Sequence, residues 1–145
     1  VLATTGYSKE DEEMIRMLQK ICPVDRRTNF SQGIAAMNEL AELGAARLGD
    51  KADIRVVEVH HTKKADAPSG TARTLGHHLG IPEADYPAYI ASLRMGNVFG
   101  QHTVYFAMED EVLEIRHTAY SKRIFALGAL EAGKQMVQEN RKQEC

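Results

Sequence analysis

The segment over residues 52–61, "ADIRVVEVHH", constrains the fold most strongly because it alternates like a β-strand and is apolar on both faces for part of its length. Ile54 and Val56 fall on one face of this expected strand, and Val57 and Val59 fall on the other. We therefore predict a strand with two apolar faces, which ends at a pair of adjacent histidines.

Helical periodicity precedes this strand. Ser8 and Asp11 have the spacing of a capping box, so a helix is expected from Ser8, with one face formed by Met14, Leu18 and Ile21. A second helix is expected over residues 31–49, where apolar residues recur at steps of three and four: Ile34, Met37, Ala41, Ala45 and Leu48. Short strands are expected at residues 1–4 and 22–24.

Beyond the strand, the pattern predicts a helix over residues 69–80 and then an irregular stretch containing Pro82 and Pro87. Two alternating runs meet at Glu109 and Asp110, which predicts a hairpin. A long helix is expected from Ser121, with its apolar side formed by Phe125, Ala129, Ala132 and Met136 and with Ile124 and Leu127 beside them. This order of elements favours an α/β beginning followed by an α+β unit.

The composition is that of a globular protein with one real core. The 145 residues are 43% hydrophobic and 26% charged, which argues against disorder. A net charge of −2 gives no electrostatic reason to expect nucleic acid or an anionic membrane as a partner. Two cysteines, Cys22 and Cys145, do not favour a disulfide framework or a cysteine zinc site, so a cytoplasmic location is expected. The start at Val1 rather than Met is interpreted as that of a fragment or trimmed product.

The stretch "EVHHTKKADAPSGTA", residues 58–72, concentrates reactive side chains after the strand. His60 and Lys64 would be roughly 13 Å apart in an extended chain, so a turn is required if both serve one site. Asp66 and Pro68 supply turn residues. Ser69 to Thr71 would form the first turn of a helix, whose free N–H groups favour a carboxylate or phosphate. We interpret the stretch as an anion site beside a histidine and a lysine that could donate a proton.

Other interpretations stay open from the residues alone, since a histidine pair at a strand end is more often a surface feature than a catalytic one. Ser-Gly-Thr before a helix is most often only a cap. The histidines could bind zinc or nickel, but Lys63 and Lys64 would repel a cation and no metalloprotease-type spacing occurs, so no metal site is predicted. His77 and His78, in "LGHHLG", are expected on the surface of a helix.

The same stretch resembles the signature of the dihydrodipicolinate reductase family, E-x-H-H-x-x-K-x-D-A-P-S-G-T-A, with every fixed position filled. Four further segments resemble family motifs in the same order: "ATTGYS", "TNFSQG", "SLRMGNVFGQHTVYF" and "HTAYSKRIFALGAL". The resemblance implies an α/β fold in which a remnant of a Rossmann-type nucleotide-binding domain is followed by an α+β substrate domain with a mixed sheet.

The implied domains are a partial dinucleotide-binding domain at residues 1–30, a substrate-binding and oligomerisation domain at 31–120, and a C-terminal helix at 121–145 that returns to the nucleotide-binding part. The implied activity is the NADPH- or NADH-dependent reduction of a cyclic dicarboxylate in lysine and diaminopimelate biosynthesis. A homotetramer is implied as well, in which Leu113, Ile115 and their hairpin partners face another subunit.

The resemblance also assigns roles to matched positions. His60 and Lys64 would be the catalytic acid/base pair. The substrate carboxylates would be bound by His61, Ser69, Gly70 and Thr71. The nicotinamide side of the cofactor would be lined by Ala3, Thr4, Thr5, Arg27, Thr28, Asn29 and Phe30.

The chain departs from the family in its nucleotide-binding part. It contains no G-x-G-x-x-G, Ala3 replaces a family glycine, and Lys122 stands where an arginine is usual. Two hypotheses follow: the chain is the C-terminal part of a complete reductase, or it is a stand-alone dicarboxylate-binding or oligomerisation module without redox activity.

Overall fold

The computed structural model describes residues 1–4 and 7–143, the last three of these by their backbone alone. The chain forms two compact units, one made of Val1–Ser31 with Arg123–Cys145 and one made of Gln32–Lys122. These boundaries lie close to the domain limits expected from the sequence, while the functions assigned to the three parts stay a prediction.

The unit 32–122 is built on a mixed four-stranded sheet with the order β2-β1-β3-β4. Its strands are β1 (Asp53–His60), β2 (Ile90–Arg94), β3 (Gly100–Ala107) and β4 (Val112–Ala119). β1 pairs with β2 in parallel and with β3 antiparallel, and β3 pairs with β4 antiparallel. The predicted strand, the predicted hairpin and the mixed α/β class are therefore confirmed.

Strand β2 was not predicted, because the sequence indicated an irregular stretch around Pro82 and Pro87. That stretch contains a 3₁₀ turn at Glu83–Asp85 and the short helix α4 (Tyr86–Tyr89), and the five residues of β2 follow at once. The apolar residues of β2 do not form one face, because Ile90 shares a face with Ser92 and Arg94 while Ala91 and Leu93 lie on the other face and are exposed. Pairing with β1 determines its conformation, and that pairing is a tertiary contact.

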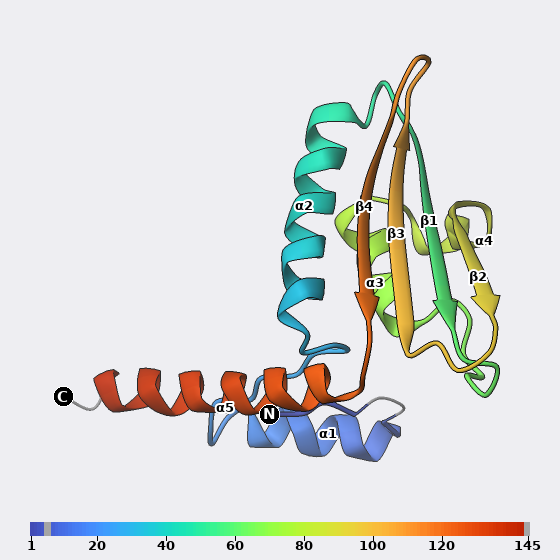
Figure 1. Cartoon of the computed structure of the whole chain (residues 1–145). Helices are drawn as coiled ribbons and strands as arrows, with labels where there is room; N and C mark the ends of the chain where they lie inside the picture. The colour runs from blue at the N-terminus through green and yellow to red at the C-terminus, as the bar shows by residue number, and fades with distance from the viewer. Residues whose placement is uncertain (5–6, 144–145) are drawn as a thin grey trace. The chain divides into compact units, whose positions relative to one another are not determined.

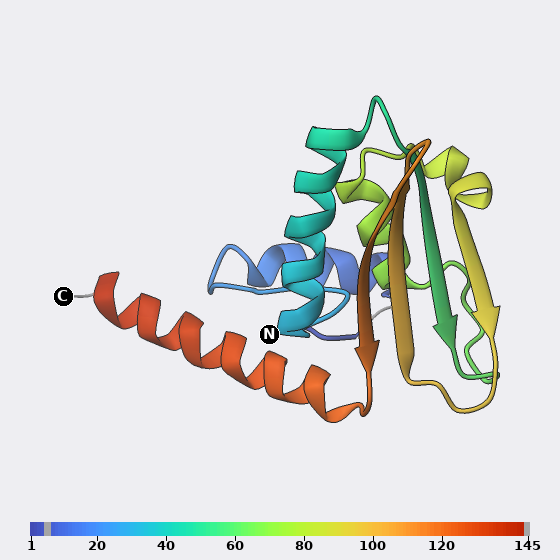
Figure 2. The same cartoon turned by 45° about the horizontal axis from the view of Figure 1, so that its top comes forward.

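Helices α2 (Gln32–Leu48) and α3 (Gly70–His78) cover one face of the sheet, as Figures 1 and 2 show. The periodic residues of α2 behave as predicted: Ile34, Met37 and Ala41 are buried, and Ala45 and Leu48 pack against the same core. α3 begins with Ser69 as its N-cap and ends before Gly80, whose φ of 71° is in the left-handed region that glycine tolerates. The core between helices and sheet contains Ile34, Met37, Ala41, Val56, Ala72, Leu75, Leu79, Ile81, Tyr86, Ile90, Val104 and Phe106.

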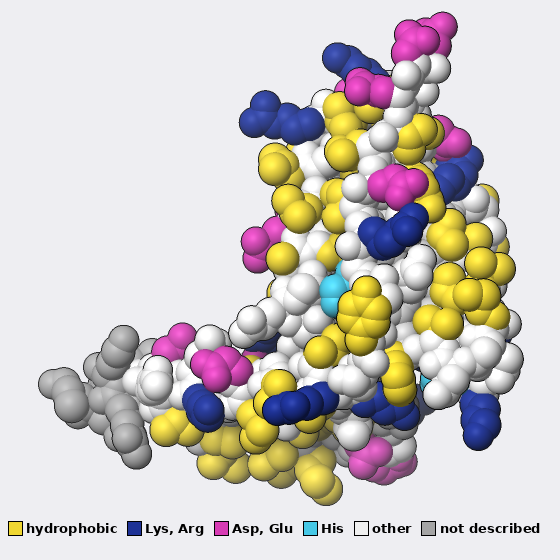
Figure 3. All heavy atoms as spheres, in the orientation of Figure 1, with side chains coloured by type: hydrophobic (Ala, Val, Ile, Leu, Met, Phe, Trp, Pro, Cys, Tyr) yellow, Lys and Arg dark blue, Asp and Glu magenta, His cyan; other side chains and the backbone are white. Residues whose placement is uncertain are grey.

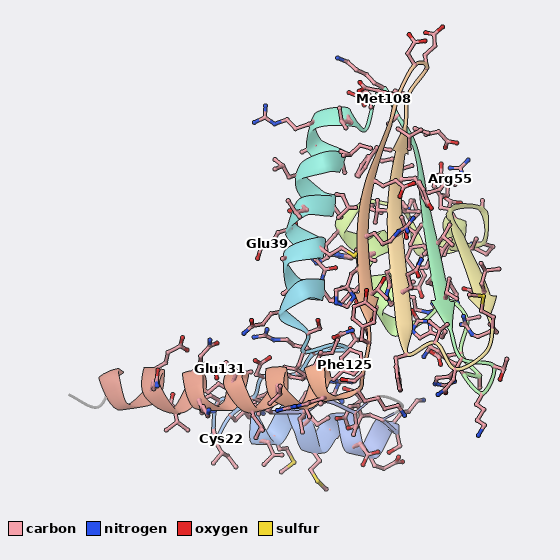
Figure 4. The ribbon with its side chains drawn as sticks, viewed as in Figure 1. Cys22, Glu39, Arg55, Met108, Phe125 and Glu131 are labelled. Carbon is pink, nitrogen blue, oxygen red and sulfur yellow. The ribbon has the colours of Figure 1, made fainter. Side chains whose placement is uncertain are left out.

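The other face of the sheet carries no helix in this unit. Arg55, labelled in Figure 4, projects from that face because the neighbouring Val56 faces the core, and its guanidinium lies 4.9 Å from the centre of the Tyr89 ring. Ile115 was expected to face another subunit, but it packs against the core under α2, so this prediction is wrong for that residue. Leu113 lies two residues earlier and so on the same face as Ile115.

The unit formed by the two chain ends contains α1 (Lys9–Leu18) and α5 (Arg123–Gln143). The Ser8–Asp11 capping box is present, as predicted. Met14 and Leu18 share one face of α1 as predicted, but that face is exposed, Ile15 is the buried residue, and Ile21 lies beyond the helix end at Leu18. Figure 3 shows apolar side chains gathered along this helix. α5 confirms the long C-terminal helix, with Ala132 buried on the predicted side and Leu127 half exposed.

Residues 1–4 and 22–24 do not form the two predicted strands. A single parallel bridge joins Leu2 to Arg26, with the Leu2 amide donating to the Asp25 carbonyl oxygen at 2.8 Å. α5 approaches this region closely, because a Cβ atom at Gly128 would lie 1.8 Å from the Phe30 carbonyl oxygen. Within the described residues, no helix combines the length and the apolar character needed to cross a bilayer.

Candidate active site

The helix-covered face of the sheet changes from apolar to polar at the same level on all four strands. On β1 the core residue Val56 is followed on the same face by Glu58 and His60. The strand register places Glu58 between Ser92 of β2 and His102 of β3, and His102 beside His117 of β4. A row of polar side chains therefore crosses the sheet where the apolar core ends.

Glu58 is fully buried and remains ionised. Its Oε2 contacts His60 Nδ1, and its Oε1 accepts hydrogen bonds from Arg94 Nη2 at 2.8 Å and from the Ser69 amide at 3.4 Å. Burial by itself raises the pKa of Glu58, but hydrogen bonds from His60, Arg94 and Ser92 outweigh it and lower that pKa to about 2. The site therefore contains a fixed negative charge at its base.

His102 lies next to His60 and is held in the neutral form. The two rings are in edge contact, with centroids 5.1 Å apart, and His102 is 3% exposed. Burial is the largest cause that lowers the pKa of His102 to about 3, and the neighbouring His60 lowers it further. His102 Nε2 lies 3.2 Å from the Ser69 hydroxyl, which connects β3 to the start of α3.

The segment 61–68, which we call the Lys64 loop, turns back after β1 as the sequence predicted. Lys64 Nζ donates to Asp66 Oδ1 at 2.7 Å, and this hydrogen bond is the main cause that lowers the pKa of Asp66. Arg94 Nη2 donates to the Asp66 carbonyl oxygen at 2.6 Å. The Met95 amide donates to the His60 carbonyl oxygen at 2.9 Å, so the loop is held beside the end of β2.

The Ser-Gly-Thr segment forms the start of α3. Its contacts are compatible both with a simple helix cap and with a part in the polar site. Ser69 is a true N-cap, since its hydroxyl oxygen accepts the Ala72 amide at 3.2 Å. Ser69 and Thr71 are nevertheless buried, and Ser69 also contacts Glu58 and His102, so the cap lies inside the polar row. Gly70 is the first residue of the helix.

The other histidines divide into two groups. His61 is partly buried, and in the part of the chain that the structure describes its Nδ1 has no hydrogen-bond partner. His77 is exposed, and His78 Nδ1 lies 3.0 Å from Glu42 Oε2 on the surface, as the sequence predicted for this pair.

The predicted cofactor residues belong to the other unit. Ala3, Thr4 and Arg27 to Phe30 lie in two segments that the Leu2–Arg26 bridge holds side by side, while Thr5 lies outside the described residues. Arg27 pairs with Asp25 at 2.7 Å and lies over the Phe30 ring at 5.4 Å. The predicted catalytic and substrate-binding residues therefore lie in the unit 32–122. The predicted cofactor residues that the structure describes lie in the unit formed by the two chain ends.

One cluster has the composition of a metal site. Ligand atoms of Glu58, His60 and His102 lie within 4.8 Å of one another. Both oxygens of Glu58, however, already accept hydrogen bonds from protein groups, and Arg94 places a positive charge beside them. The prediction of no metal is therefore retained for the described residues on chemical grounds.

Two buried groups of this site predict sensitivity to acid. The unfolded chain protonates His102 near pH 6.5 and the folded chain only near pH 3, so the unfolded state binds more protons between these values. Lowering the pH from 7 to 5 should reduce the free energy of unfolding by about 2 kcal/mol through His102, and the lowered pKa of Glu58 should extend the loss below pH 4.5.

Urea unfolding across this pH range measures the effect. His102→Gln should flatten the pH dependence between pH 7 and 5, and His77→Gln, at an exposed position, should leave it unchanged. Equal slopes for His102→Gln and the unmodified chain would contradict the assignment.

The sequence interpretation missed three members of this site: Glu58, Arg94 and His102. Glu58 stood inside the quoted stretch, and its even spacing from Val56 and His60 was the available signal for a shared face. Arg94 and His102 are 36 and 44 residues from Glu58 in the sequence, and their side chains meet it only through the sheet register.

Known proteins resemble the chain over most of its length. A family model described as "Dihydrodipicolinate reductase, C-terminus" matches residues 33–144. The chain belongs to the dihydrodipicolinate reductase family. A 4-hydroxy-tetrahydrodipicolinate reductase of Campylobacter fetus subsp. fetus is 38% identical over 91% of the chain, and one of Clostridium novyi is 38% identical over 97%.

The chain spans about 60% of these relatives, which is 59% of the first and 62% of the second. A solved dihydrodipicolinate reductase from Paenisporosarcina sp. TG-14, with dipicolinate bound, superimposes with a TM-score of 0.69 at 24% identity, over 94% of this chain and 58% of that one. Because the match covers 94% of the chain, it supports the fold of a dihydrodipicolinate reductase for residues of both units.

Proposed function

We propose that the chain is the C-terminal part of a complete 4-hydroxy-tetrahydrodipicolinate reductase and carries its substrate chemistry. The observation that carries the proposal is the joining of His60 and the Lys64 loop to one buried network through Glu58 and Arg94. Family membership and the length of the relatives support the same assignment.

The proposed reaction needs a hydride at one end of an unsaturated ring bond and a proton at the other. NADH or NADPH supplies the hydride when bound. In our proposal His60 and Lys64 deliver the proton, because an imidazole and an ammonium can each act as a general acid. The His60 ring presents Nε2 to the substrate, since Nδ1 is occupied by Glu58.

The substrate carboxylates would bind at the first turn of α3, through Ser69, Gly70 and Thr71, with His61 beside them. Amide groups at a helix start and the nearby lysine favour an anion. Dipicolinate, the ligand named for the Paenisporosarcina protein, is a dicarboxylate of the class proposed here.

The cofactor would be held only in part by this chain. Residues 3–5 and 27–30 fit the nicotinamide side, because the Leu2–Arg26 bridge places the two segments next to each other. The chain has no Gly-rich phosphate loop, so the nucleotide phosphates need groups outside it. Exposed apolar side chains of this unit, among them Met14, Met17 and Leu130, are the surface that a completed nucleotide-binding domain would cover.

A homotetramer in the cytoplasm is part of the proposal. The uncovered face of the sheet supports an interface between subunits, since it presents Val57, Tyr105 and Thr118 beside the charged Arg55 and Arg116. Residues 31–120 would then combine substrate binding with oligomerisation, and residues 121–145 would return to the nucleotide-binding part.

Calorimetric titration of pyridine-2,6-dicarboxylate into the protein tests the substrate site. We expect binding that Thr71→Val weakens about tenfold, by loss of one hydrogen bond to an anion. His77→Gln, at an exposed position of α3, should leave it unchanged. Binding that neither variant alters would refute the placement of the carboxylates.

The stand-alone module is the second hypothesis and predicts a different result. A module would bind the dicarboxylate but would show no NADH- or NADPH-dependent turnover in any longer protein that contains it. Turnover by the complete reductase, together with loss of that turnover in the variants discussed below, would reject the module.

A further inference from the structure

The Glu58 carboxylate determines the proton position on the neutral His60 ring. A carboxylate that stays ionised can only accept hydrogen bonds, so the nitrogen that faces it must donate. That nitrogen is Nδ1 of His60. In the neutral ring the proton therefore resides on Nδ1, and Nε2 is left to exchange a proton with a ligand. Gly100 leaves space at that nitrogen, because a Cβ atom there would lie 3.1 Å from Nε2.

Arg94 connects this arrangement to the Lys64 loop. It lies beside His60 in the parallel register of β1 and β2. A single nitrogen, Nη2, donates both to Glu58 Oε1 at 2.8 Å and to the Asp66 carbonyl oxygen at 2.6 Å. Asp66 in turn accepts the Lys64 ammonium. One side chain thus bridges the carboxylate behind His60 and the loop that carries Lys64.

Both bridging groups are shielded from water. The Glu58 side chain is 0% exposed and the Arg94 side chain is 19% exposed. Removal of one partner from a buried charge pair leaves the other uncompensated, so these two residues depend on each other. The charged and titratable groups that surround His60 on the packed elements are Glu58, Arg94, Lys64, Asp66, His102 and His117.

We propose that Glu58 and Arg94 are positioning residues for the His60–Lys64 pair: Glu58 fixes which ring nitrogen of His60 carries the proton, and Arg94 ties the Lys64 loop to Glu58. This inference rests on the proposed function of His60 and Lys64. It adds two residues to the site, each of which acts through another group.

Glu58→Gln tests the role of Glu58 through the tautomer of the His60 ring, which a merely structural role would not change. The Arg94 and Ser69 donors attract the amide oxygen of the substituted side chain, so its NH₂ group must face His60 Nδ1. Nδ1 then has to accept, and the proton moves to Nε2. We expect ¹⁵N spectra of the neutral ring to show the Nδ1–H form in the unmodified chain and the Nε2–H form in Glu58→Gln.

Comparison with His60→Gln assigns the ring signals, and Glu114→Gln, an exposed glutamate that pairs with Arg116 on β4, is the matched control. The same Nδ1–H form in Glu58→Gln and in the unmodified chain would overturn the role of Glu58. If Glu58→Gln does not fold, as judged by circular dichroism, the Nδ1–H form in the unmodified chain decides the point, because an Nε2–H form there excludes the proposed acceptor.

Arg94→Gln tests the second half of the inference. We expect weaker binding of pyridine-2,6-dicarboxylate, by about tenfold, with the Nδ1–H form of His60 retained, because the Lys64 loop loses its anchor while Glu58 keeps its contact with His60. Arg94→Lys should recover part of the affinity, since it restores the charge without the planar fork. Arg73→Gln, which removes an exposed arginine of α3, is the control.

Unaltered affinity in Arg94→Gln would refute the anchoring role. The ring spectra are recorded without substrate, so they report on Glu58 even if the proposed reaction is wrong. Failure of the proposed function would appear instead as turnover that does not depend on His60 or Lys64.

Discussion

Replacing His60 by Gln, or Lys64 by Ala, in the reductase that contains this chain should lower turnover by roughly 10²–10⁴-fold. Both residues keep their place in the fold through contacts that the structure shows: His60 through Glu58 and Lys64 through Asp66. Loss of a positioned proton donor slows the chemical step itself, so the effect should fall mainly on kcat.

Steady-state oxidation of NADH or NADPH with the cyclic dicarboxylate substrate measures this effect. Lys63→Ala is the matched control for Lys64→Ala, because Lys63 is the exposed neighbour in the same loop and its loss changes the net charge equally. His77→Gln, on the surface of α3, serves His60→Gln in the same way. Unchanged turnover in both site variants would reject the acid/base assignment.

The second large effect is expected on stability, at Phe106. Its ring is 0% exposed and belongs to the core between the sheet and α2. Phe106→Ala should reduce the free energy of unfolding by about 3–5 kcal/mol, through lost burial and the cavity that is left. Leu113→Ala, at the cross-strand partner of Phe106, should cost far less, because Leu113 is 44% exposed. Urea unfolding followed by circular dichroism compares the two.

Gly44 on α2 packs directly against the Phe106 ring. A Cβ atom at residue 44 would lie 2.6 Å from Phe106 Cζ, so the helix can pack here only without a side chain. Gly44→Ala should therefore destabilise the fold even though alanine favours helices. The double variant with Gly44→Ala and Phe106→Leu should lose less free energy of unfolding than the sum of the two single variants, because the smaller side chain at position 106 relieves the overlap. Strict additivity would contradict this contact.

Much of the fold was predictable because its local patterns are strong. The three- and four-residue spacing from Ile34 to Leu48 predicted α2 correctly, and alternation predicted β1 and the β3–β4 hairpin. The predictions failed where a few residues had to be judged without their neighbours. β2 has five residues and depends on β1, and Ile21, expected on one face of the first helix, lies beyond the end of α1 at Leu18.

The sequence by itself determined which reactive residues are adjacent along the chain, as in His60, Lys64 and Ser69, and which helices and strands carry them. Only the tertiary structure decided that Arg94 and His102 join them. Their contacts with Glu58 and Ser69 span 36 and 33 residues, and they form because β2 and β3 align with β1 in one register. A local pattern contains no information on that register; the packing of whole strands under α2 and α3 sets it.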